Sequence, residues 1–153
     1  MEKREEFTTA MKNAMKDKNQ TTLSTIRLIM AALKDKDIAA RAQGKADGIN
    51  EQEILSMLQS MIKQRHESAK MYCDAGREEL AEREEAEIEV IEQFLPKQLG
   101  ESEVQGIIAE LITEMDAKEI KDMGKVMGAL KERYAGQLDM SKASGAVKAA
   151  LAA

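Results

Sequence analysis

Apolar residues in this chain of 153 residues recur at three- and four-residue steps, which is the spacing of one helix face. No segment alternates at the two-residue period of a strand, and β-branched residues are sparse outside the helical patterns. Aromatic residues make up only 3%, whereas methionines number eleven, so we expect a core of Leu, Ile, Met and Ala. The sequence therefore predicts an all-α protein.

The single proline, Pro96, divides the chain. A residue that precedes proline disfavours the helical region, so the helix before it is expected to end near Phe94. We place a domain boundary there, with an N-terminal unit of roughly four helices over 1–95 and a three-helix unit over 96–153. We expect no internal repeat in either half.

Local signals place the helix ends. Asn50 and Asp139 are predicted N-caps, a polar break at 19–22 separates the first two helices, and Gly76 and Gly136 are predicted to end helices. The inner face of the first helix, expected over 5–18, is assigned to Phe7, Ala10, Met11, Ala14 and Met15.

The stretch 122–142 is the most informative of the C-terminal half. Five residues lie on one helix face, and we expect them in the core: Met123, Val126, Met127, Leu130 and Tyr134. Gly124 and Gly128 lie on the same helix, where a glycine costs roughly 1 kcal/mol against alanine. Close packing against another backbone is the favoured explanation for both glycines, and the approach of a ligand is the alternative.

Positive charge gathers at the C-terminus of an otherwise acidic chain. Residues 125–153 hold five basic residues against two acids, while the whole chain has a net charge of −5. These basic residues are our candidates for contacts with RNA phosphates: Lys125, Lys131, Arg133, Lys142 and Lys148. Plain solvated surface is the competing interpretation. With few aromatic residues, any RNA contact would follow backbone and shape rather than bases.

The helix predicted over 78–94 is strongly acidic. Residues 74–92 hold nine acids against Arg77 and Arg83. This pattern is typical of a solvated helix face, and a surface for a basic partner is the sharper alternative.

Catalytic chemistry has little support in the sequence. His66 precedes Cys73 by two helical turns, about 10 Å, too far for a nucleophile to hydrogen-bond its base. A phosphate-binding Gly-x-x-x-x-Gly-Lys-Ser/Thr loop and zinc-type Cys/His spacing are absent, and Glu82, Glu85 and Glu89 resemble a helix surface rather than a magnesium site. We expect no catalytic residues, no metal and no cofactor.

Cellular location is inferred from missing signals. No apolar run reaches the length of a membrane span, and the first residues, MEKREEFTTAMKNAMK, lack the pattern of a secretory signal. The single cysteine has no partner for an internal disulfide. We therefore expect a cytoplasmic protein.

Several motifs occur in an order that resembles the GatB/YqeY family of small bacterial proteins. They are TLSTIRLIMAALK, IKQRHESAKMYCDAGREELAEREEAEIEVIEQFLP, FLPKQL, DMGKVMGALK and GQLDMSKASGAVKAAL, which together span nearly the whole chain. The resemblance implies two all-α domains, the second similar to the tail domain of the B subunit of aspartyl/glutamyl-tRNA amidotransferase. That domain is associated with holding tRNA, and the family label implies a carbon–nitrogen ligase with glutamine as amido donor.

Three functional hypotheses follow. The first is a non-catalytic RNA-associated module that contacts tRNA through its C-terminal unit. The second is an accessory or subunit of an amidotransferase, and the third is a protein-interaction adaptor that uses the acidic helix. The sequence does not name a protein partner or an oligomeric state.

Overall fold

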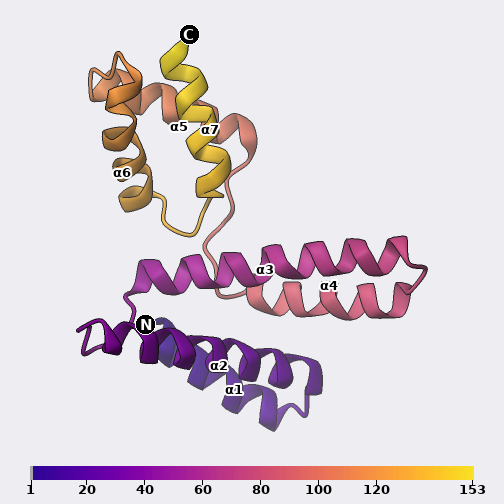
Figure 1. The fold of residues 1–153 in the computed structure, drawn as a ribbon. Coiled ribbons are helices and arrows are strands. Elements are labelled where there is room, and N and C mark those ends of the chain that lie inside the picture. The colour runs from indigo at the N-terminus through magenta and orange to yellow at the C-terminus, as the bar shows by residue number, and fades with distance from the viewer. Residues whose placement is uncertain (1) are drawn as a thin grey trace. The chain divides into compact units, whose positions relative to one another are not determined.

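The computed structural model describes residues 2–153 and confirms the all-α prediction (Figure 1). Within that range the chain forms seven α-helices, one short 3₁₀ helix and no strand. The elements are α1 (Lys3–Lys16), α2 (Gln20–Ala42), α3 (Glu51–Asp74), α4 (Glu78–Glu92), α5 (Glu101–Glu114), η1 (Ile120–Asp122), α6 (Met123–Arg133) and α7 (Met140–Ala152).

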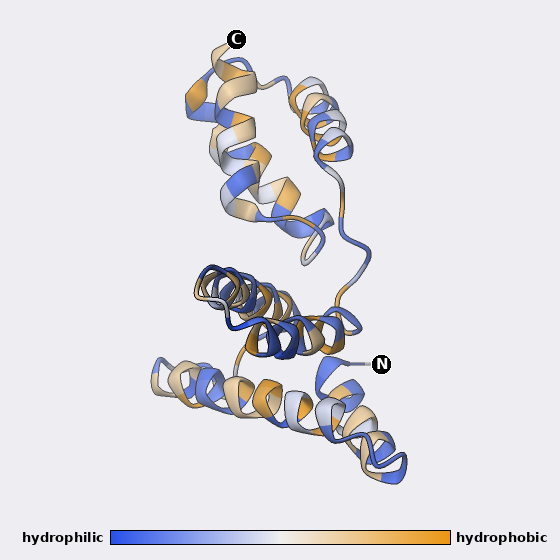
Figure 2. Ribbon diagram, turned by 90° about the vertical axis from the view of Figure 1, so that its right-hand side faces the viewer, coloured by the Kyte–Doolittle hydropathy of each residue, from blue (hydrophilic) through white to orange (hydrophobic). Residues whose placement is uncertain are grey.

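The chain divides into two compact units, Met1–Pro96 and Lys97–Ala153. The sequence placed this boundary one residue earlier. Each unit has its own hydrophobic core, so each is described by itself. Figure 2 shows hydrophilic and hydrophobic residues side by side on the helices of both units, the pattern of helices that bury only one face.

The N-terminal unit consists of two helical hairpins, α1–α2 and α3–α4, with α2 packed against α4 (Figure 1). Its core brings together residues from near the beginning and the end of the unit's sequence. Phe7 of α1 and Phe94, just after α4, meet edge to face with ring centroids 5.0 Å apart. Ile26, Ile54 and Ile91 are fully buried in the same core.

Capping side chains fix where these helices begin. Asn19 accepts a hydrogen bond from the Thr22 amide at 3.1 Å, and Asn50 accepts one from the Glu53 amide at 2.9 Å. Gly76 follows α3 with a φ of +74°, a conformation that favours glycine. Met15 was expected in the core but is 53% exposed, because it lies at the edge of the apolar stripe one residue before α1 ends.

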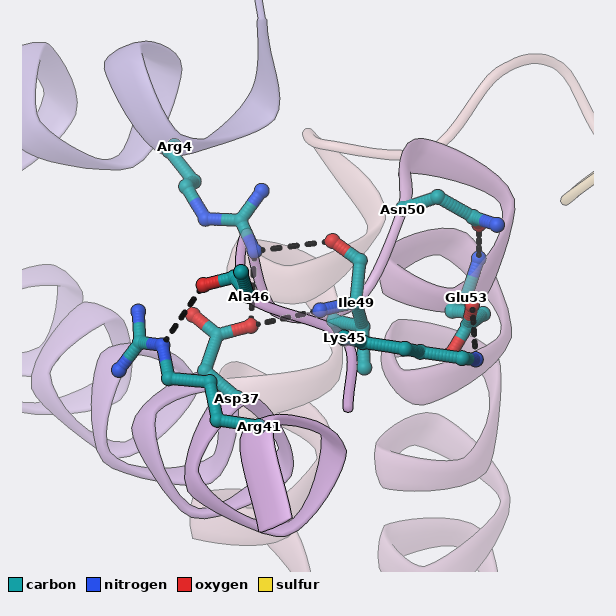
Figure 3. A network of polar contacts seen from close by, with 8 residues as sticks. All are labelled: Arg4, Asp37, Arg41, Lys45, Ala46, Ile49, Asn50 and Glu53. Atoms are coloured by element: carbon teal, nitrogen blue, oxygen red, sulfur yellow. Dashed lines mark hydrogen bonds and ion pairs between the residues drawn. The ribbon is translucent and has the colours of Figure 1, made fainter. Parts of the chain in front are cut away.

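A buried carboxylate connects α1, α2 and the loop before α3 (Figure 3). Asp37 of α2 is 8% exposed and lies 2.7 Å from the guanidinium of Arg4 in α1. The same Asp37 oxygen accepts the Ile49 amide at 2.9 Å, and Arg4 donates to the Ile49 carbonyl at 2.9 Å. Three segments far apart in sequence therefore share one closed set of hydrogen bonds.

The ionisation of Asp37 follows from these contacts. Burial raises the pKa of Asp37, but the hydrogen bonds from Ile49 and Arg4 outweigh burial, and the pKa lies below its ordinary value. Because a buried charge is tolerated only when it is paired, Asp37 is held ionised by the contacts that order the loop.

The C-terminal unit packs α5, α6 and α7 against one another around Ile108, Val126, Leu130 and Val147. The segment after Pro96 is tied to the turn between α6 and α7. The Gln98 side chain donates to the Gly136 carbonyl at 2.7 Å.

The turn itself is defined by two features. Gly136 has a φ of +77°, which ends the α6 segment. Asp139 caps α7 by accepting from the Ser141 amide at 2.8 Å. Both features agree with the positions that the sequence indicated.

We predict that residues 1–96 and 97–153 each fold when produced separately, because each encloses its own core. Far-ultraviolet circular dichroism should show a cooperative thermal transition for each fragment. A C-terminal fragment that loses helicity without a cooperative transition, and regains it when mixed with the N-terminal fragment, would contradict this independence.

We also predict that Gly48→Ala destabilises the protein by about 3 kcal/mol. Gly48 has a φ of +81°, and a Cβ there would overlap the carboxylate of Asp37. Gly44→Ala is the matched control: its φ is +92°, but a Cβ would meet nothing within 4 Å. In urea denaturation, the free energy of unfolding of this variant should fall by only about 1 kcal/mol, the cost of the positive φ for alanine. Equal losses of unfolding free energy in the two variants would show that the Asp37 side chain can move away from the new Cβ without destabilising the protein.

Candidate nucleic-acid interface

Positive charge exceeds negative charge in the part of the C-terminal unit that forms α6 and α7. Helix α5 carries four glutamates and no basic residue. Residues 123–152 carry all five basic candidates against two acids, Glu132 and Asp139. A polyanion is therefore attracted by α6 and α7 and repelled by α5.

Helices α6 and α7 have related sequences, a relation that corrects the expectation of no internal repeat. Residues 122–131 and 139–148 both read Asp-Met-x-Lys-x-x-Gly-Ala-(Leu or Val)-Lys. Both helices begin at the methionine of this pattern, Met123 in α6 and Met140 in α7. We refer to these two segments as the repeat.

The repeat buries equivalent positions. Val126 and Leu130 of α6 are 0% exposed, and their counterparts Ala143 and Val147 of α7 are 1% and 0% exposed. The lysines and the shared glycine of the pattern lie outward: its four lysines are exposed, as are the glycines Gly128 and Gly145. The structure thus presents one cation-and-glycine arrangement twice.

Close packing, the favoured explanation for Gly124 and Gly128, is wrong within the C-terminal unit. Both glycines are exposed, and a Cβ built on either would meet nothing within 4 Å. Gly145 of α7 is open in the same way. The spacing of the apolar residues indicated which face of the helix is buried. It did not show that the glycines lie on the opposite face.

The glycines lie between the lysines. At about 100° per residue, Lys125 and Lys131 are roughly 120° apart around α6, and Gly124 and Gly128 fall inside that arc. On α7 the same geometry places Gly145 between Lys142 and Lys148. Each helix therefore exposes bare backbone flanked by two cations.

Three of the four lysines in the repeat have no ion pair among residues 2–153: Lys131, Lys142 and Lys148. Lys125 reaches Asp122 only at 4.0 Å. The pKa of Asp122 is lowered mainly by the backbone amides of Lys118 and Glu119, which donate to its carboxylate. The lysine charges are consequently available to a ligand.

Arg133 differs from the lysines. Its guanidinium forms two hydrogen bonds to Glu114 of α5, at 3.1 and 2.9 Å. The hydrogen bond and the charge of Arg133 lower the pKa of Glu114. Arg133 is thus partly neutralised, which makes it the weakest of the five phosphate candidates. Tyr134 is partly buried against the core of this unit.

The residues considered for catalysis are not brought into a site. His66 and Cys73 are both exposed on α3. Within residues 2–153, no three His, Cys, Asp or Glu side chains gather in a manner suited to a metal ion. No helix in this range is long and apolar enough to cross a membrane.

These features define a class of protein: two all-α units, the second with a repeated basic helix face. The family described as "Yqey-like protein" matches residues 4–151. The chain belongs to this family, as its motifs indicated.

Curated relatives carry the name "Altered inheritance of mitochondria protein 41, mitochondrial". The protein from Pyrenophora tritici-repentis is 28% identical over 138 residues, 86% of this chain and 73% of that relative. The one from Lachancea thermotolerans is 33% identical over 107 residues, 69% of this chain and 55% of that relative. The Clavispora lusitaniae protein is 30% identical over 111 residues, 71% and 62% respectively.

The comparisons correct one expectation and leave another without support. All of these relatives are named as mitochondrial, which contradicts the cytoplasmic location expected from missing signals. They are also fungal, so they do not support the bacterial source associated with the resemblance.

We predict that Gly128→Ala and Gly145→Ala each stabilise the protein by up to about 1 kcal/mol. Both positions are helical and open, so alanine gains helix propensity without a clash. Gly136→Ala is the opposite control, since its φ of +77° strains any side chain. Urea denaturation of the three variants shows whether each substitution raises or lowers the free energy of unfolding. A loss of stability in the first two would reveal a packing role.

Proposed function

We propose that this protein is a non-catalytic RNA-associated module that holds tRNA by its backbone through α6 and α7. The observation that carries the proposal is the repeat, with its exposed, largely unpaired lysines flanking open glycine backbone. Lysine is a point charge that suits phosphate, and exposed glycine lets a phosphate come close to the helix.

The resemblance supports the choice of tRNA. The segments DMGKVMGALK and GQLDMSKASGAVKAAL, which form α6 and α7, are the ones similar to the tail domain of the amidotransferase B subunit. The aromatic content of the unit is one tyrosine, Tyr134, which lies partly in the core. Contacts of this kind follow phosphate positions and RNA shape rather than base identity.

Two other functions are weaker. An accessory role in an amidotransferase rests on the family label alone. An adaptor role has one structural observation in its favour: Glu78, Glu82, Glu85, Glu89 and Glu92 are all exposed and fall on one stripe of α4. An acidic stripe is also what a solvated helix face looks like.

Replacing Lys125 and Lys131 with Ala should weaken tRNA binding and flatten the dependence of log K on log salt by roughly one to two units. Lys142→Ala with Lys148→Ala should have a similar effect, because α7 repeats the geometry of α6. The matched control is Lys118→Ala with Lys121→Ala. These lysines are about as exposed, at 75% and 76%, but lie outside the repeat and pair with Asp116 and Glu119.

The measurement is a tRNA titration at several salt concentrations, with helicity checked for each variant. Gly128→Ala and Gly145→Ala add a second readout, since loss of binding in a stabilised protein separates contact from folding. If replacing either lysine pair changes tRNA affinity and its salt dependence no more than replacing the control pair does, the repeat is ordinary surface. The adaptor hypothesis is then favoured.

A further inference from the structure

Helix α2 exposes a second stripe on the side opposite its core face. Its buried residues include Leu23, Ile26 and Leu33. About 180° away, six exposed residues follow at alternating steps of four and three, the spacing of a helix–helix seam. This outer seam consists of Ser24, Leu28, Ala31, Asp35, Ile38 and Ala42.

The outer seam is apolar for an exposed surface. Leu28 and Ile38 are 46% and 53% exposed, and they are two of the five large hydrophobic side chains that are exposed in residues 2–153. Ala31 lies between them and Ala42 follows, so a second helix can come close at these points. Apolar side chains aligned in this way mark an interaction site more often than scattered ones do.

A row of positive charge follows one edge of the outer seam. Arg27, Lys34 and Arg41 are exposed and recur at steps of seven, so they lie on the same side of the seam. Arg27 and Lys34 form no ion pair within residues 2–153, and Arg41 donates only to the Ala46 carbonyl at 3.3 Å. The other edge holds Ala32 and Ala39. We call the charged row the basic edge.

The charge pattern argues against a second copy of α2 as the occupant. If two copies paired antiparallel, each basic edge would face the other, Lys34 against Lys34. If they paired parallel, Asp35 would face Asp35 across the seam. Like charges in contact disfavour both arrangements.

We propose that the outer seam of α2 docks an amphipathic helix of another protein, one with an apolar stripe and an acidic edge. The apolar stripe of the partner covers Leu28 and Ile38, and its carboxylates pair with the basic edge. This is recognition of a helix by an apolar helix face, with charge fixing which edge lies where. The proposal concerns the N-terminal unit and does not depend on RNA binding by α6 and α7.

The test uses the full chain and two synthetic helical peptides of matched length. Both carry leucines at seam spacing, and they differ only in having glutamates or lysines along one edge. Fluorescence anisotropy should show binding of the glutamate peptide at least tenfold tighter than the lysine peptide. Leu28→Ser with Ile38→Ser should abolish this binding.

Charge reversal gives a readout that unfolding cannot imitate. Arg27→Glu with Lys34→Glu should reverse the preference, so that the lysine peptide binds more tightly. Lys63→Glu with Lys70→Glu, two exposed positions on α3, is the matched control and should leave the preference unchanged.

Three results would overturn the proposal. The first is equal or absent binding of the two peptides to the wild-type chain. The second is a dimer, seen by sedimentation, that Ile38→Ser dissociates, which would make a second copy the occupant. The third is tRNA binding that Arg27→Glu with Lys34→Glu abolishes while peptide binding is unaffected, which would assign the basic edge to RNA.

Discussion

Both cores are built under one constraint: each helix buries only one face, and there are few aromatic side chains to fill space. The N-terminal unit meets this constraint with two hairpins that share one core, and the C-terminal unit with three helices. Burial of one stripe leaves the opposite face of every helix free of packing demands. The outer seam of α2 and the lysine faces of α6 and α7 occupy such faces.

The N-terminal core also depends on a charge. The loop that connects α2 to α3 has few apolar contacts of its own, and Ile49 is its buried residue. Asp37 fixes that residue through its amide, while Arg4 holds both the carboxylate and the Ile49 carbonyl. Removing the charge of Arg4 would leave the Asp37 carboxylate buried without its cation, which costs more than the pair contributes. The hydrogen bonds therefore specify how the two hairpins connect.

The helical spacing of apolar residues and the chemistry of helix caps explain why much of the fold was predictable. The helices, the caps at Asn50 and Asp139 and the turn at Gly136 depend on residues close together in sequence. The Asp37 contacts do not, because Arg4 is 33 positions away and the other partner is backbone. A charged residue in a helical pattern gives no sign that its side chain is buried.

The candidate site was predictable only in part. The lysines were identifiable as a local excess of charge, but the direction of the glycines depends on packing that sequence spacing does not reveal. The cost of a glycine within a helix suggested that Gly124 and Gly128 are needed for close packing, but that cost does not show which way the glycines face. The repeat, by contrast, was visible in the sequence. It is short and lies within one unit, so a search for whole-domain duplication passes over it.

Electrostatics limits what the repeat can do alone. The chain has a net charge of −5, so its overall field does not draw RNA in from a distance. Attraction acts within about a Debye length of α6 and α7, roughly 8 Å at physiological salt. Four lysines correspond to a salt slope of about −3, which is the range of weak, non-specific binding. Strong association with RNA therefore requires a second contact on the same complex. A helix docked on α2, carried by a protein that itself holds the RNA, would supply it by raising the effective concentration of the repeat at the phosphate backbone.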